Sequence, residues 1–213
     1  MFYLYLVIAL ILGYLLGSIP TALIISKKKF HIDIRDYGSK NLGGTNTGRV
    51  LGKKWGLLTY ILDAAKTGVP IIIASLIFKH FNIEHYDAIV YAMGCASLIG
   101  HCYPIFAGFN GGKAVACSFG FLFATNLPLF FFSLIALILI VLIKKYVSLG
   151  TMVSVFLASV FSLLPPFTKT MFFYLEYSYM YTLTLFVITI FVVIRHKKNI
   201  IRLIRGEESK VKF

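Results

Sequence analysis

Residues 2–29 read FYLYLVIALILGYLLGSIPTALIISKKK, and this stretch decides how the rest of the chain is interpreted. A helix needs roughly 20 apolar residues to cross a hydrocarbon layer of about 30 Å, and the segment from Phe2 to Ile25 meets that length. Three lysines follow it and no basic segment precedes it, so we expect a retained membrane span rather than a cleaved signal peptide.

Apolar stretches of this kind recur along the chain. Of the 213 residues, 59% are hydrophobic and only 14% are charged, which leaves too little polar side-chain surface for a soluble domain. We therefore expect an all-α integral membrane protein, a single transmembrane domain over residues 1–213, with about seven transmembrane helices. The spans are expected near residues 2–25, 56–78, 88–106, 114–126, 128–143, 149–166 and 178–194. The fourth and fifth are short and could form one broken or re-entrant element.

The positions of the basic residues predict the orientation. Most of the 21 Lys and Arg residues fall in segments 26–55, 107–113 and 144–148 and in the C-terminal tail, all on the same side of the expected spans. Short loops rich in Lys and Arg stay in the cytoplasm, so the N-terminus is expected outside and the C-terminus in the cytoplasm. The net charge of +13 is thereby explained without a nucleic-acid partner. Cys95, Cys102 and Cys117 lack metal-ligand spacing and are expected to be packing residues.

The first cytoplasmic segment has the composition of a phosphate-binding loop. Residues 33–49 read DIRDYGSKNLGGTNTGR. Glycines allow backbone amides to converge on an anion, Ser39 and Thr45 add hydroxyl donors, and the planar fork of Arg49 matches phosphate oxygens. The alternative is a flexible basic loop that only touches anionic lipid head groups.

A second segment on the same face follows the third span. It contains residues 100–104 (GHCYP) and 109–114 (FNGGKA). Gly111, Gly112 and Lys113 at the start of a helix could place bare backbone amides and an ammonium group around one anion. The Walker pattern is absent, which argues against nucleotide binding. Alternatively, Lys113 is only a topology residue.

Two further groups carry polar chemistry. His196 and Asn199 are three residues apart at the end of the last span, so they share a helical face and could orient a polyol hydroxyl. A basic run in that position is also a common topology signal. Asp63 and Lys66 lie within the second span, where a structural ion pair is favoured over a role in lining a substrate cavity.

In this order, these blocks resemble the bacterial acyl-phosphate-dependent glycerol-3-phosphate acyltransferases, and the likeness covers almost the whole chain. It is carried by residues 17–20 (GSIP), 38–46 (GSKNLGGTN) with Arg49, 62–66 (LDAAK), 100–104 (GHCYP), 111–113 (GGK) and Arg195-His196 with Asn199. The chain departs from the usual family pattern at Lys40, Gly44, Tyr103 and Ala114, where the family has Gly, Ala, Phe and Gly.

The resemblance implies a site at the cytoplasmic face. Ser39, Arg49 and Lys113 would hold substrate phosphates, and His196 and Asn199 would position glycerol-3-phosphate. The further substrate-binding residues would be Asn41, Thr45, Asn46, His101, Gly111, Gly112, Ser148 and Thr151.

The implied reaction is transfer of a fatty acyl group from acyl phosphate to the 1-hydroxyl of glycerol-3-phosphate, which gives lysophosphatidic acid and inorganic phosphate. The substrates and membrane lipid would be the partners, with room for a soluble enzyme that makes the acyl phosphate. No cofactor, metal or coenzyme A is implied. The expected location is the bacterial inner cell membrane.

Two alternatives use other features of the sequence. His31 and Asp36 match the H-x-x-x-x-D signature of a different acyltransferase superfamily, but the later blocks of that superfamily are absent, so we treat the match as chance. A small membrane transporter or anion-binding module could also use basic Gly-rich loops. Transporters often show repeated halves with broken helices at the membrane midplane, and the sequence shows no such repeat.

Overall fold

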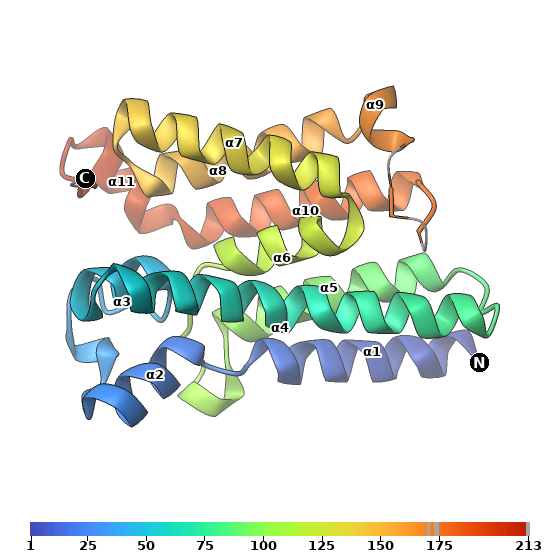
Figure 1. Ribbon diagram of the computed structural model, residues 1–213, viewed down its shortest axis with the longest axis horizontal. Coiled ribbons are helices and arrows are strands. Elements are labelled where there is room, and N and C mark those ends of the chain that lie inside the picture. The colour runs from blue at the N-terminus through green and yellow to red at the C-terminus, as the bar shows by residue number, and fades with distance from the viewer. Residues whose placement is uncertain (170, 173–174, 212–213) are drawn as a thin grey trace. The chain divides into compact units, whose positions relative to one another are not determined.

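The computed structural model describes residues 1–169, 171–172 and 175–211, and those residues form helices and loops without a strand (Figure 1). The all-α prediction is confirmed for this part of the chain. The elements are α1 (Phe2–Gly17), α2 (Thr21–Phe30), η1 (Ile34–Asp36), α3 (Gly44–Leu51), α4 (Lys53–His80), α5 (Tyr86–Cys102), η2 (Ile105–Ala107), α6 (Val115–Thr125), α7 (Leu127–Lys144), α8 (Val147–Phe161), α9 (Pro165–Thr168), α10 (Tyr179–Arg195) and α11 (Lys197–Ile204).

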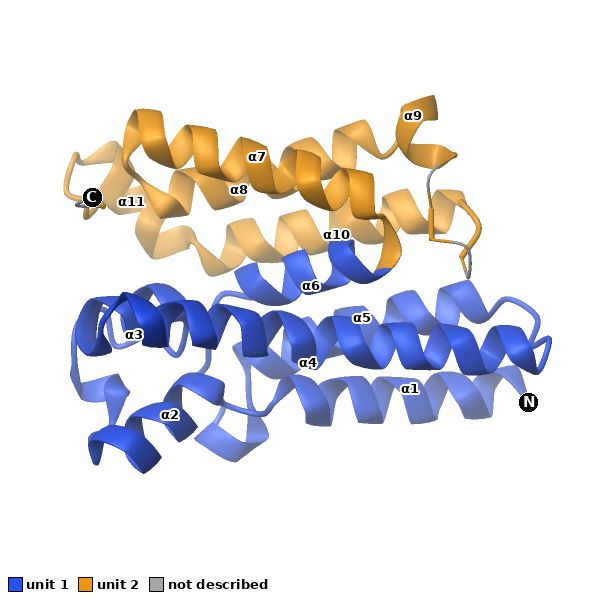
Figure 2. Cartoon of the chain, viewed as in Figure 1, with its two compact units in different colours: residues 1–124 blue, residues 125–213 orange. Residues whose placement is uncertain are grey.

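The chain folds as two compact units, residues 1–124 and residues 125–213 (Figure 2). In the first unit, α1, α4 and α5 pack side by side, and α3 lies against α4. Glycines allow α1 and α5 to approach closely, as is common between membrane helices. A methyl group on Gly17 would come within 2.6 Å of Ser97 Cα, and one on Gly100 would come within 2.9 Å of the Ser18 amide nitrogen.

The first predicted span is broken near its end. α1 ends at Gly17 and α2 begins at Thr21, with Pro20 at the N-cap of α2. Proline has no N–H to donate and cannot continue the hydrogen-bond ladder of α1. The break turns the chain before the three lysines. α2 ends at Phe30, and its C-cap residue, His31, has a left-handed backbone (φ 57°).

In the second unit, α8 packs between α7 and α10. Hydroxyl pairs join α8 to α10: Ser159 lies 2.8 Å from Thr189, and Ser162 lies 2.9 Å from Thr182. All four residues are buried. Hydrogen bonds of this kind hold helices together in a membrane, because apolar side chains gain little free energy by moving from lipid into a contact between helices.

Four segments of the described chain are long and apolar enough to cross a membrane: Phe2–Phe30, Lys53–His80, Tyr86–Ala107 and Leu127–Lys144. A fifth is reached if α10 and α11, which bend by 62° at their junction, count as one span. α6 and α8 are apolar but shorter. The fourth and fifth predicted spans correspond to two helices, α6 and α7, with Asn126 between them. Asn126 caps α7 by accepting a 2.9 Å hydrogen bond from the Leu129 amide.

The close contact of α1 with α5 makes Gly100 intolerant of a side chain. Gly100→Ala is expected to lower the free energy of unfolding by about 1–3 kcal/mol, because the new methyl group overlaps the backbone of α1. Thermal unfolding in detergent would measure this. Gly48→Ala is the matched control, since its methyl group would meet only an ordinary contact at 3.5 Å. Equal melting temperatures for the two variants would contradict the packing argument.

Candidate active site

The loop that carries Ser39 is held by the side chain of Asn46. The side-chain oxygen Oδ1 of Asn46 accepts a 2.7 Å hydrogen bond from the Ser39 backbone amide, and the side-chain Nδ2 donates to the Tyr37 carbonyl at 3.1 Å. Asn46 is only 1% exposed, whereas Ser39 is exposed. Asn46 therefore fixes the loop from inside and leaves the Ser39 hydroxyl at the surface.

α3 places the next two predicted residues on one face. Thr45 and Arg49 are four residues apart in this helix, so they are neighbours on its surface, and both are exposed. The Thr45 hydroxyl hydrogen-bonds with the Tyr60 hydroxyl of α4. Asn41, just before α3, is half-buried, with its Nδ2 beside Gly43. Ser39, Asn41, Thr45 and Arg49 thus belong to one short loop-and-helix segment.

The loop that carries Lys113 folds back along the end of α5. The Gly111 amide donates to the Cys102 carbonyl at 3.2 Å, and the Gly112 amide donates to the His101 carbonyl at 3.0 Å. The prediction that these two amides are bare and available to an anion is therefore wrong. Carbonyls at a helix C-terminus lack helical partners, and here the loop supplies them. Lys113 follows, half-buried, two residues before the start of α6.

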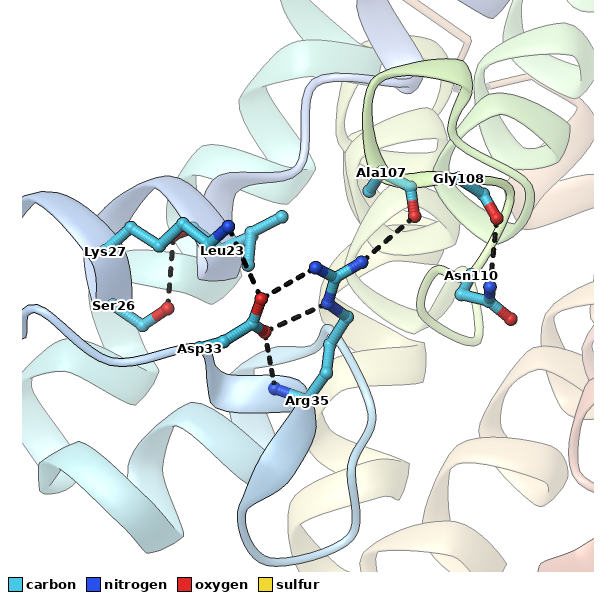
Figure 3. Close-up of polar contacts among 8 residues, drawn as sticks. All are labelled: Leu23, Ser26, Lys27, Asp33, Arg35, Ala107, Gly108 and Asn110. Atoms are coloured by element: carbon cyan, nitrogen blue, oxygen red, sulfur yellow. Dashed lines mark hydrogen bonds and ion pairs between the residues drawn. The ribbon is translucent and has the colours of Figure 1, made fainter.

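The ion pair of Arg35 with Asp33, which we call the arginine clasp, joins the loop of Ser39 to the loop of Lys113 (Figure 3). Arg35 donates to both carboxylate oxygens of Asp33, at 2.9 and 2.6 Å, and also to the Ala107 carbonyl at 3.3 Å. Lys27 adds an ion pair with Asp33 at 3.4 Å. The Arg35 guanidinium holds the pKa of the Asp33 carboxyl well below its usual range. The clasp thus stays charged at neutral pH and ties the segment of Ser39 to the segment of Lys113.

An apolar cluster supports the same junction. Its members come from α2, η1, the loop before α3, and η2: they are Ala22, Leu23, Ile34, Leu42 and Ala107. Ile34 and Leu42 flank the loop of Ser39, and Ala107 belongs to the loop that leads to Lys113. Burial of these side chains and the clasp therefore hold both Gly-rich segments in one place in the first unit.

The second unit brings together another part of the predicted site. Ser148 Oγ and Asn199 Nδ2 donate to the same oxygen of Glu208, at 2.7 and 2.6 Å, and Arg202 Nε donates to the other oxygen at 2.7 Å. His196 lies at the bend between α10 and α11, 3% exposed, with Nδ1 2.8 Å from the Val192 carbonyl. Thr151 donates within α8 to the Val147 carbonyl.

Glu208 is a residue that the sequence reasoning missed. Burial raises the pKa of its carboxyl, but hydrogen bonds from Asn199, Ser148 and Arg202 outweigh burial, and the pKa lies below its ordinary value of 4.5. The signal in the sequence is weak: Glu207 and Glu208 are acidic residues in a tail that is otherwise basic. The structure shows that Glu208 orients Ser148 and Asn199.

The two residues of the second acyltransferase signature both lie at the surface. His31 is exposed at the C-terminal end of α2, and Asp36 is exposed in η1. The carboxylate that forms ion pairs in this segment is that of Asp33, and its partners are Arg35 and Lys27. The interpretation of the His31 and Asp36 match to H-x-x-x-x-D as chance stays a prediction.

The family model for glycerol-3-phosphate acyltransferase matches residues 7–206 of the chain. The chain belongs to the glycerol-3-phosphate acyltransferase family. A glycerol-3-phosphate acyltransferase of Fusobacterium nucleatum is 41% identical over 96% of this chain and 97% of its own length. One from Listeria welshimeri is 38% identical over 98% of each chain. The resemblance drawn from the sequence is confirmed.

Solved structures of the same family agree. A crystal structure of PlsY, an integral membrane glycerol 3-phosphate acyltransferase, in the glycerol 3-phosphate form is 35% identical, with a TM-score of 0.84 over 97% of this chain and 96% of the other. The lysophosphatidic acid form is 34% identical, with a TM-score of 0.82 over 97% and 95%. The chain is thus an integral membrane acyltransferase of the glycerol-3-phosphate acyltransferase family, not a transporter.

Loss of the clasp should weaken catalysis without unfolding the protein. Arg35→Ala is expected to lower kcat/KM by about 10- to 100-fold, because small misplacements of substrate-binding groups cost that much. Arg35→Lys should restore only part of the activity, since lysine cannot bind a carboxylate with two parallel hydrogen bonds. Lys28→Ala, at an exposed lysine near the clasp, is the control. Wild-type kinetics for Arg35→Ala would show that the clasp does not position the loops.

Glu208 should make stability depend on pH. Its lowered pKa means that it stabilises the fold above its unfolded value of about 4.5, and this contribution is lost as the pH falls through the folded pKa. Glu208→Gln is expected to lower the melting temperature at neutral pH and to flatten its decrease on acidification. Glu207→Gln makes the same chemical change at an exposed neighbour and should leave the dependence of the melting temperature on pH unchanged. Identical profiles for both variants would contradict this role.

Proposed function

We propose that the protein transfers a fatty acyl group from acyl phosphate to the 1-hydroxyl of glycerol-3-phosphate, giving lysophosphatidic acid and inorganic phosphate. The observation that supports it most is the junction of two basic, Gly-rich segments, joined by Arg35 and by the apolar cluster beneath it. Such a junction provides cations for two phosphate groups at one edge of a membrane protein. The names of the related proteins point to the same acceptor and product.

Each predicted residue then has a role in the proposed reaction. Ser39, Arg49 and Lys113 bind substrate phosphates, and His196 and Asn199 position the glycerol-3-phosphate. Asn46 fixes the loop from inside, Asn41 and Thr45 shape its outer face, and Gly111 and Gly112 form the turn before Lys113. Ser148 and Thr151 help bind the hydroxyl groups of the glycerol-3-phosphate. We propose that residues 1–213 form a single transmembrane acyltransferase domain, and the family model that matches residues 7–206 supports this.

The chemistry needs little beyond positioning and charge. The 1-oxygen of glycerol-3-phosphate attacks the acyl carbonyl carbon, a new ester C–O bond forms, and the C–O bond to the donor phosphate breaks. The departing phosphate accepts the proton of the hydroxyl group. Acyl phosphate is already a mixed anhydride, so no covalent enzyme intermediate is required. Lys113 and Arg49 stabilise the charge that develops on the carbonyl and phosphate oxygens.

The proposed topology places this site at the cytoplasmic face of the bacterial inner cell membrane. Seven spans follow if the shorter helices α6 and α8 also cross, and an odd number places the N-terminus outside and the C-terminus in the cytoplasm. The excess of Lys and Arg in the segments around α2, α3 and the C-terminal tail supports this orientation. A soluble enzyme that makes acyl phosphate would then deliver the donor from the same side.

The deciding experiment gives purified protein acyl phosphate and glycerol-3-phosphate and follows the release of phosphate together with the formation of lysophosphatidic acid. Arg49→Ala and Lys113→Ala should each lower kcat/KM by about a hundredfold or more, because each removes a cation that contacts the reacting phosphates. His31→Ala should keep wild-type activity. Loss of turnover in His31→Ala alone would overturn the site assignment, and turnover only with acyl-coenzyme A would overturn the proposed donor.

A further inference from the structure

A cluster of buried charge lies inside the first unit, directly behind the loop of Lys113. One carboxylate oxygen of Asp63 lies 2.8 Å from Lys66 Nζ and 3.4 Å from His101 Nδ1. The side chains of Asp63, Lys66 and His101 are only 1%, 6% and 5% exposed. The structural ion pair expected between Asp63 and Lys66 is confirmed. Buried charge in a membrane protein is costly to maintain, which suggests that the cluster does more than join two helices.

The cluster is fixed to the surrounding helices on several sides. Thr21 Oγ1, at the start of α2, donates to the same Asp63 oxygen at 2.6 Å. Lys66 also donates to the carbonyl of Ile19 at 2.8 Å, where α1 and α2 separate. Cys117 Sγ of α6 donates to the Asp63 backbone carbonyl at 3.3 Å. The carboxylate therefore has a fixed position relative to α1, α2, α4 and α6.

His101 connects this fixed charge to the loop. Its ring nitrogen Nδ1 faces Asp63, and its backbone carbonyl accepts the hydrogen bond of the Gly112 amide at 3.0 Å. The other edge of the ring lies directly against Gly112: a methyl group there would come within 2.8 Å of Cε1 and would overlap Nε2. Gly112 thus contacts both the backbone and the ring of His101, and Lys113 is the next residue.

We infer that His101, held by Asp63 and Lys66, is a positioning residue that sets the placement of Lys113 through Gly112. One edge of its ring faces Asp63 and the other lies against Gly112, so this inference gives His101 a positioning role where the resemblance implied a direct substrate contact. The ring supports the Gly112 backbone, and the backbone in turn sets where the Lys113 ammonium lies. The inference rests on the proposed role of Lys113 in phosphate binding.

The test uses variants that alter this support from both sides. His101→Asn keeps a side-chain N–H near Asp63 but removes the ring atoms behind Gly112. It is expected to raise the KM for at least one phosphate substrate by about tenfold, with a smaller change in kcat, because Lys113 stays present but is less well placed. Thr67→Val is the matched control: it breaks a buried 2.7 Å hydrogen bond to Ser97 between the same two helices, α4 and α5, and should change neither constant.

Gly112→Ala tests the same contact from the loop side. It leaves the buried charged residues unchanged, so it does not endanger folding through them. Alone it should also raise KM, because the methyl group pushes the loop away from the ring. His101→Asn makes room for that methyl group. In the double variant, the increase in KM should therefore be about tenfold smaller than the product of the two single increases. A histidine that stabilised the fold without supporting the Gly112 loop would not give this smaller increase in KM.

The outcomes separate this inference from the proposed function. If Lys113→Ala keeps full activity, the proposed site itself is wrong. If Lys113→Ala is inactive while Gly112→Ala has wild-type kinetics, or while the effects of Gly112→Ala and His101→Asn simply multiply, His101 does not act through Gly112 and only the present inference is overturned. A His101→Asn protein that fails to fold leaves the Gly112→Ala comparison to decide.

Discussion

The first unit depends on the neutralisation of Asp63. A carboxylate that is 1% exposed within a long apolar helix must find cations and donors nearby, since lipid offers neither. Lys66 satisfies this from the same helix, but Thr21 and His101 reach it from α2 and α5, so the charge can be buried only when three helices are in place. Glycine contacts between α1 and α5 then bring the backbones close enough for these short distances. The buried charge therefore couples the positions of α2, α4 and α5.

The same logic governs the loops at the end of these helices. Their backbone groups are paired by specific partners: Asn46 binds the loop of Ser39, and the His101 and Cys102 carbonyls bind the Gly111–Gly112 turn. Arg35 then joins the two loops through the Ala107 carbonyl. In the proposed site, a substrate phosphate is bound most tightly when its cations need not be ordered on binding, and these contacts order the segments of Ser39 and Lys113 beforehand.

The sequence predicts the helices well and the loop contacts poorly, for a physical reason. Apolar length and the positions of Lys and Arg identify helices such as α4 and α7, because crossing a bilayer requires them locally. The spacing of Asp63 and Lys66 likewise predicts their pairing, since both lie on one helix face. The role of Glu208 was missed because it joins Asn199 to Ser148, which lies 60 residues away, and the role of Arg35 was missed because its distant partner, Ala107, is a backbone carbonyl, which every residue has. The Gly111 and Gly112 amides were misjudged because composition does not reveal whether a neighbouring helix end will use them.

Two left-handed residues other than glycine show how firmly the loops are held. Lys40 and Ala114 both have left-handed backbones, with φ of 59° and 61°. A residue with a Cβ atom costs about 1–2 kcal/mol more than glycine in this conformation. The cost is tolerated because the flanking residues are fixed independently: Asn46 holds the Ser39 amide beside Lys40, and the Gly112 hydrogen bond to His101 lies just before Ala114. The left-handed turns at Lys40 and Ala114 are therefore held by tertiary contacts that offset this local cost.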